Sequence, residues 1–185
     1  MRAFGFAWGI AGVLAMLSFA VYRLAPIAFE LRGLQLSLLQ GAALVFSVAY
    51  MSYAEGYKGF YKGFSPRLIQ RAVFLRNNPR WLHVLLAPAF CMGYFYATRR
   101  RKILSIGLTV VVMGFVVVAR QLPQPWRGIL DAGVVAGLSV GIASILYFLV
   151  QSLRDSDFIQ VSPEVPEARG QQTSDGKGAQ VAVDA

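Results

Sequence analysis

Residues 55–80 read EGYKGFYKGFSPRLIQRAVFLRNNPR and form the one long polar, basic segment between runs of apolar residues. The tetrapeptide Tyr-Lys-Gly-Phe occurs at 57–60 and is repeated at once at 61–64. Alternating aromatic and basic side chains are typical of the headgroup layer of a membrane. The side of a bilayer on which this segment lies therefore decides the topology of the chain.

The rest of the chain is too apolar for an ordinary soluble domain. Of its 185 residues, 56% are hydrophobic, against about 45–50% in soluble proteins. The apolar residues form blocks close to the ~20 residues that a helix needs to cross a bilayer. The sequence predicts an all-α integral membrane protein with one transmembrane domain, residues 1–151, and five hydrophobic helices. The expected spans are 3–24, 34–54, 81–98, 103–119 and 129–150.

Local signals set the boundaries of these helices. Pro26 is expected to end the first helix, and Pro88 to kink the third, which is only just long enough to cross. Ser65 is the expected N-cap of a short amphipathic helix, residues 65–76, lying in the membrane interface. Residues 152–185 are rich in Gly, Gln, Ser and acidic residues and are expected to be a disordered tail.

Glycines at helical spacing predict close helix packing in two of the runs. Gly133, Gly137 and Gly141 recur every fourth residue in the last run, and Gly5 and Gly9 form the same pair in the first. Such a groove lets a second backbone approach closely, which drives association where lipid supplies no hydrophobic force. Packing within one chain, with Gly5 and Gly9 as partners, and self-association between copies both fit this pattern.

The formal net charge is +9, and the basic residues gather at the ends of apolar runs. This placement favours anionic lipid headgroups, not nucleic acid, as the partner. The expected lipid-binding or partner-binding side chains of the 55–80 segment are basic or aromatic: Lys58, Lys62, Arg67, Arg71, Arg76, Tyr57, Phe60, Tyr61 and Phe64. Exposed positive charge orienting the loop, and a docking site for a protein, are the alternatives.

Two topologies compete. If all five runs cross, the 55–80 segment and the basic turn at 99–102 lie on opposite faces. If the third run turns back, both join Arg2 and Arg154 on one face, as the positive-inside rule prefers. In either arrangement the C-terminal tail is expected in the cytoplasm, and the side of the 55–80 segment stays open with a preference for the cytoplasm.

Groups that carry catalysis are scarce. There is one histidine, His83, and one cysteine, Cys91, and no HExxH, GxSxG, P-loop or CxxC motif, so neither a metal nor another cofactor is expected. Asp131 lies one turn inside the last helix, where Arg127 can pair with it. Glu55 is expected to pair with Lys58 and Lys62. His83, Asp131 and Glu55 are the candidates for a polar site.

The sequence therefore favours a non-catalytic, multi-pass membrane protein: an accessory or assembly subunit, or a homo-oligomer, packed through glycines and bound to anionic headgroups. A small transporter or channel for an anionic solute is the alternative. A membrane-embedded lipid-modifying enzyme using His83 and an acid is the third hypothesis.

Overall fold

A computed structural model describes residues 2–77, 85–94 and 99–154, and all regular structure within these ranges is helical. The remaining segments include His83, both ends of the third apolar run and the tail beyond Arg154, so the predictions for them lie outside the described residues. The elements in chain order are α1 (Arg2–Phe29), η1 (Glu30–Gly33), α2 (Leu38–Met51), η2 (Ser52–Phe64), α3 (Ser65–Asn77), α5 (Ala87–Met92), α6 (Arg99–Gln121) and α7 (Trp126–Arg154).

Two helices are long and apolar enough to cross a membrane, Phe4–Gly33 and Trp126–Arg154. At 1.5 Å per residue, the 29 residues of α7 extend about 43 Å, which matches a bilayer with its headgroup layers. The expected break at Pro26 is wrong, because α1 continues through this residue to Phe29. Among the described residues, length and composition support these two of the five predicted membrane helices, and Ser105–Gln121 is a shorter apolar stretch.

The described part of the 55–80 segment, residues 55–77, is helical and not a loop. α2, η2 and α3 join without interruption into one continuous helix, residues 38–77, which we call the central rod. Ser37 caps its first turn: the side chains of Ser37 and Gln40 each accept a hydrogen bond from the other's backbone N–H. Ser65, the expected N-cap of a separate helix, has helical dihedral angles instead, and its N–H donates to the carbonyl of Phe60. The expected interfacial helix 65–76 exists as α3, but as the end of the rod.

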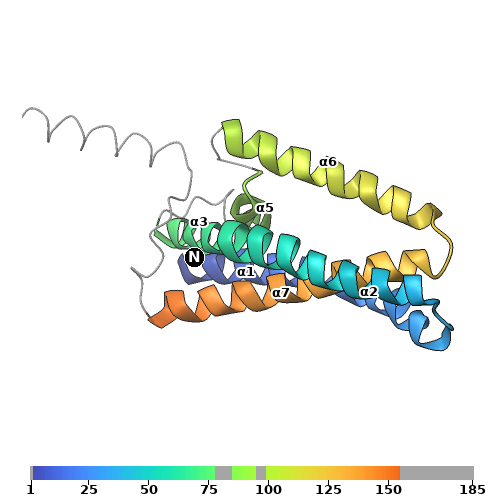
Figure 1. The fold of residues 1–185 in the computed structure, drawn as a ribbon. Coiled ribbons are helices and arrows are strands. Elements are labelled where there is room, and N and C mark those ends of the chain that lie inside the picture. Colours follow the sequence, from blue (N-terminus) through green and yellow to red (C-terminus); the bar gives the residue numbers. More distant parts are fainter. Residues whose placement is uncertain (1, 78–84, 95–98, 155–185) are drawn as a thin grey trace, which may run out of the picture.

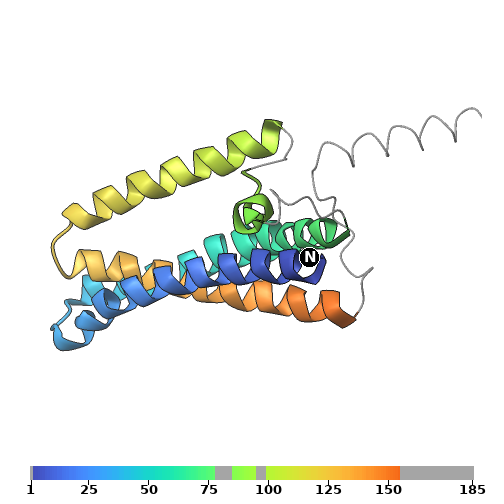
Figure 2. The ribbon, with the colours of Figure 1, turned by 180° about the vertical axis from the view of Figure 1, so that it is seen from behind.

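The central rod, α1 and α7 lie side by side, and α6 lies apart from them and approaches them toward its end (Figures 1 and 2). The core lies where α3, α5 and α7 meet the first half of α1. Leu68, Ile69, Ala72 and Leu75 of α3 are almost fully buried there, against Ile10 and Val13 of α1, Phe90 of α5 and Ile145 of α7. The apolar face of α3 is therefore covered by protein, which corrects its expected placement against lipid.

The predicted third span, 81–98, is wrong in its described part. Between residues 85 and 94 the only helix is α5, six residues long. Pro88 lies in its first turn, where proline fits a helix, so it starts this helix instead of kinking a longer one. Gly93 ends it in the left-handed conformation, with φ of 86°, which glycine adopts without steric cost. α3 ends and α6 begins at the same end of the molecule (Figure 1).

Candidate functional site

The unusual backbone of η2 determines the candidate site. Its 13 residues form a π-helix, in which hydrogen bonds join residues five apart, as from Ser65 N–H to Phe60 C=O. π-Helical geometry is rare, appears mostly as single turns, and is frequent at functional sites. Each turn is wider than the 3.6 residues of an α-helix, so side chains four and five positions apart lie over one another. The Tyr-Lys-Gly-Phe repeat lies within this segment.

This geometry aligns tyrosines and lysines on the outer face of η2. The ring centroids of Tyr53 and Tyr57 are 6.0 Å apart, and those of Tyr57 and Tyr61 are 5.6 Å apart, in nearly parallel stacks. Lys58 Nζ lies 5.9 Å from the centroid of Tyr53, and Lys62 Nζ lies 4.9 Å from that of Tyr57. Both separations fall within the ~6 Å of a cation–π contact. We call these five residues the tyrosine–lysine ladder.

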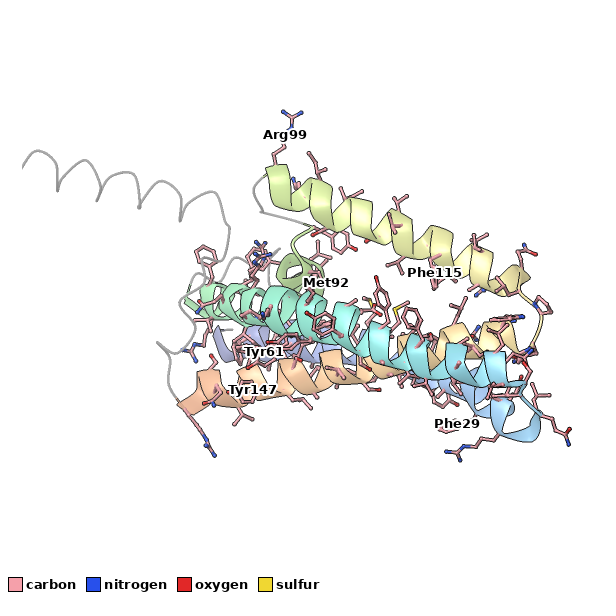
Figure 3. All side chains as sticks on the ribbon, in the orientation of Figure 1. Phe29, Tyr61, Met92, Arg99, Phe115 and Tyr147 are labelled. Carbon is pink, nitrogen blue, oxygen red and sulfur yellow. The ribbon has the colours of Figure 1, made fainter. Side chains whose placement is uncertain are left out.

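Sequence reasoning missed Tyr53 as a member of the ladder, although it placed Tyr57, Lys58, Tyr61 and Lys62 together. The signal was present: tyrosines at 53, 57 and 61 extend the period of four by one step toward the N-terminus. In the structure Tyr53, Tyr57, Lys58 and Lys62 are exposed, whereas Tyr61 also contacts α7. The labelled Tyr61 and Tyr147 lie close together between the rod and α7 (Figure 3).

Another face of the central rod, formed by α2 and η2, meets the glycines of α7. A Cβ at Gly133 would collide with Ser47 of α2, and one at Gly137 would lie 3.0 Å from Glu55 Oε2 and 3.1 Å from the carbonyl oxygen of Met51. A Cβ at Gly141 would lie 2.7 Å from the ring of Phe60. We call Gly133, Gly137 and Gly141 the α7 seam. The central rod of the same chain covers this seam, and Gly5 and Gly9, the expected partners, do not.

The glycines of α1 serve a different contact. A Cβ at Gly9 would lie 2.8 Å from Cys91 Sγ, and one at Gly12 would collide with the ring of Pro88. Gly5 is buried as well. Small residues on α1 therefore let α5 pack directly on its backbone, and Cys91 is buried beneath, with 2% of its surface exposed.

Among the expected lipid-binding residues, Arg71 departs most from its predicted role. Only 1% of its surface is exposed. Its Nε donates a 2.7 Å hydrogen bond to the carbonyl oxygen of Phe90, and its guanidinium lies 4.5 Å from the centroid of the Phe90 ring. Phe90 is in the last turn of α5, where its carbonyl oxygen also accepts a 3.0 Å hydrogen bond from the N–H of Gly93, and the helix dipole there attracts a cation. Arg71 therefore fixes α5 to α3 and is not available to a headgroup.

Some of the other expected lipid-binding residues lie in the interface between helices, and others lie at the protein surface. Phe60 covers Gly141, and Phe64 packs edge-on against Phe60 at 5.4 Å between centroids, so both rings belong to the helix interface. Arg67 and Arg76 are half-buried, and Arg76 lies 5.8 Å from the centroid of Phe6. Of the expected set, the members of the ladder bring both rings and charges to the surface, through Tyr57, Lys58 and Lys62.

The three expected polar-site residues are not brought together among the described residues. Asp131 is buried, and its Oδ2 lies 3.7 Å from Arg127 Nε, the pair expected from their spacing. Glu55 lies against Gly137 instead of pairing with Lys58 and Lys62. His83 lies outside the described residues. No group of three or more His, Cys, Asp or Glu side chains suited to a metal occurs in the described part of the chain.

The chain was compared with protein-family models, with curated proteins and with solved structures. No family model, curated protein or solved structure matches it.

Proposed function

We propose that the chain is a non-catalytic integral membrane protein that assembles laterally with other membrane helices through α6. The observation that carries this proposal is the exposure of α6. Val110, Val111, Val112 and Met113 are successive residues, so they point to all sides of the helix, and each is at least half exposed (65, 68, 50 and 62%). A helix that is apolar all round belongs in a membrane or in the core of a large assembly.

α6 touches the rest of the chain near both of its ends, and Ala119, close to its last turn, is buried. Ser105 Oγ donates a 3.1 Å hydrogen bond to the carbonyl oxygen of Met92, and the hydroxyls of Tyr94 and Thr109 are hydrogen-bonded. Between its ends the helix lies apart from the bundle, and it slopes toward the bundle at its end (Figure 2). Its remaining length supports docking of partner helices, because its own chain leaves that surface uncovered.

The glycines of α6 are free, in contrast to those of α7. A Cβ at Gly107 or Gly114 would meet nothing within 4 Å. The two residues are seven apart and so share one face of the helix. Bare glycine faces promote association of membrane helices. The homo-oligomer or partner contact that the α7 seam suggested is therefore better placed on α6.

Removing this free face is expected to weaken assembly without unfolding the chain. In Gly107→Leu/Gly114→Leu, crosslinking in native membranes should require about tenfold more protein to give the same discrete product, since one helix contact is worth ~1–2 kcal/mol. Gly41→Leu is the matched control, because Gly41 also faces open space but lies on α2. An unchanged product in the double variant, or equal loss in Gly41→Leu, contradicts the proposal.

The helix directions support the topology in which the third run turns back. The N-terminus, the ends of α3 and α7 and the beginning of α6 all lie at one end of the molecule (Figures 1 and 2). Arg76, Arg99, Lys102 and Arg154 belong to that end. We infer four crossings, by α1, the central rod, α6 and α7, with the basic end in the cytoplasm as the positive-inside rule requires. In this arrangement Lys58 and Lys62 lie beside the middle of α7, because Phe60 of the same segment covers Gly141, so the ladder does not lie at the cytoplasmic surface.

Single cysteines distinguish four crossings from five. In a Cys91→Ala background, Arg76→Cys and Lys102→Cys are expected to react with a membrane-impermeant maleimide from the same side, and Gly33→Cys from the other. Lys102 and Gly33 are exposed, whereas Ser65 is fully buried and unsuitable for labelling. If the third run crosses, the first two cysteines instead react from opposite sides. Intact and permeabilised cells provide the two conditions.

A further inference from the structure

An apolar groove lies at the end of the bundle opposite the basic end. Its volume is about 460 Å³, within the ~300–1,000 Å³ of small-molecule sites. It is open along one side and is bounded by the last turns of α1, by η1, by α2 and by the first third of α7. Small side chains line it, namely Ala28 on α1 and Ala132 and Ala136 on α7, with Leu44 of α2 and Leu36, just before α2, on the remaining side.

The volume and position of the groove suit part of one acyl chain. On α7 its lining runs from Ala132 to Ala136, about 6 Å of helix, and Ala136 lies about 15 Å from the start of α7 at Trp126. The groove therefore lies within the leaflet at that end of the bundle, because the two leaflets share a hydrocarbon core of ~30 Å. If the groove were empty, the residues that line it would have no dispersion contacts on its side. In a bilayer, lipid tails are the apolar material available to fill it.

One cation marks the mouth of the groove. Among the described residues, Arg32 is the one charged residue that lines it. Arg32 is exposed, and its guanidinium lies 4.7 Å from the centroid of the Phe29 ring. The two carboxylates of the neighbourhood have other contacts. Glu30 Oε2 accepts a 2.9 Å hydrogen bond from Gln124 Nε2, and Asp131 lies beside Arg127. Arg32 therefore has donors to offer to an anion above the groove, and arginine binds phosphate with two parallel hydrogen bonds.

We propose that this groove holds one phospholipid, with an acyl chain between α1, α2 and α7 and its phosphate on Arg32. The inference rests on the proposed membrane location but not on α6 or on the ladder. Because lipid tails are as apolar as the groove, burial alone gives no preference over bulk lipid. Shape and the Arg32–phosphate contact supply the selectivity.

Native mass spectrometry of the detergent-purified chain with dioleoyl phosphatidylglycerol tests the proposal. The wild type should retain one lipid per chain. Arg32→Gln should bind about tenfold more weakly, the size expected for losing one charge-assisted contact. Ala136→Leu and Ala28→Leu, which fill the groove from opposite walls, should each lose the bound lipid. Ala143→Leu, on an exposed position of α7 away from the groove, should bind as the wild type does.

Two results would overturn the assignment. Unchanged binding in both groove-filling variants would show that the lipid lies elsewhere. If deacylated glycerophosphoglycerol competes as strongly as the intact lipid, the acyl chain contributes nothing to binding, which also contradicts the assignment. Recovery of the wild-type chain in carbonate-washed membranes checks the membrane location separately. A chain that is recovered there but binds lipid independently of Ala28, Arg32 and Ala136 contradicts the groove alone.

Discussion

Gly137→Leu is expected to lower the free energy of unfolding by about 3 kcal/mol, the upper part of the range for overpacking a close interface. The added side chain would start 3.1 Å from the backbone carbonyl of Met51 and 3.0 Å from Glu55 Oε2. A backbone atom of the central rod cannot rotate away, so α7 and the rod must separate. Denaturant titration in mixed micelles, followed by circular dichroism, measures the change.

Gly41→Leu again supplies the comparison, because its Cβ meets nothing within 4 Å and leucine is the better helix former. We expect that variant to be at least as stable as the wild type. Equal stability of Gly137→Leu and Gly41→Leu would mean that α7 does not pack on the rod as described. Gly137→Leu should reduce folding of the single chain first, and any loss of assembly should follow from that.

Arg71→Ala is expected to cost about 2–4 kcal/mol, through the loss of a buried charge-assisted hydrogen bond and the cavity left by the side chain. The carbonyl of Phe90 would lose its 2.7 Å donor, and the ring of Phe90 its stacked cation. α5 would then be held chiefly by its contacts with α1. The same denaturant titration gives the stability change.

The reactivity of Cys91 with a maleimide reports whether α5 stays packed in Arg71→Ala. Cys91 lies on α5, is 2% exposed and packs over Gly9. In the wild type it should react with a small maleimide only on unfolding, whereas in Arg71→Ala it should react in the folded protein. Lys62→Ala removes an exposed cation over Tyr57 and should leave both the stability and the Cys91 reaction nearly unchanged. Slow labelling of Cys91 in Arg71→Ala would contradict the role of Arg71 in fixing α5.

The buried charge of Arg71 shows where sequence reasoning reaches its limit. Arg71 lies in a basic segment with Arg67 and Arg76, and nothing in the neighbouring sequence indicates that its side chain is buried. Its partner, the carbonyl of Phe90, is 19 residues away and on another element. A hydrogen bond to a backbone carbonyl leaves no pattern in side-chain types, so only the folded chain reveals it. The same holds for Ser47, which faces Gly133 from α2.

By itself, the sequence determined the helical class, the two long apolar helices and the use of glycines for close packing, because composition and helical spacing are local properties. The Arg127–Asp131 contact also followed from spacing alone. Which surface each glycine meets, the continuity of the rod through the Tyr-Lys-Gly-Phe repeat and the short α5 were decided by tertiary structure. The physical reason is that glycine-rich polar segments fit a loop and a helix almost equally well. The contacts of Gly56 with Val140 and of Phe60 with Gly141, between residues about 80 positions apart, favour the helix.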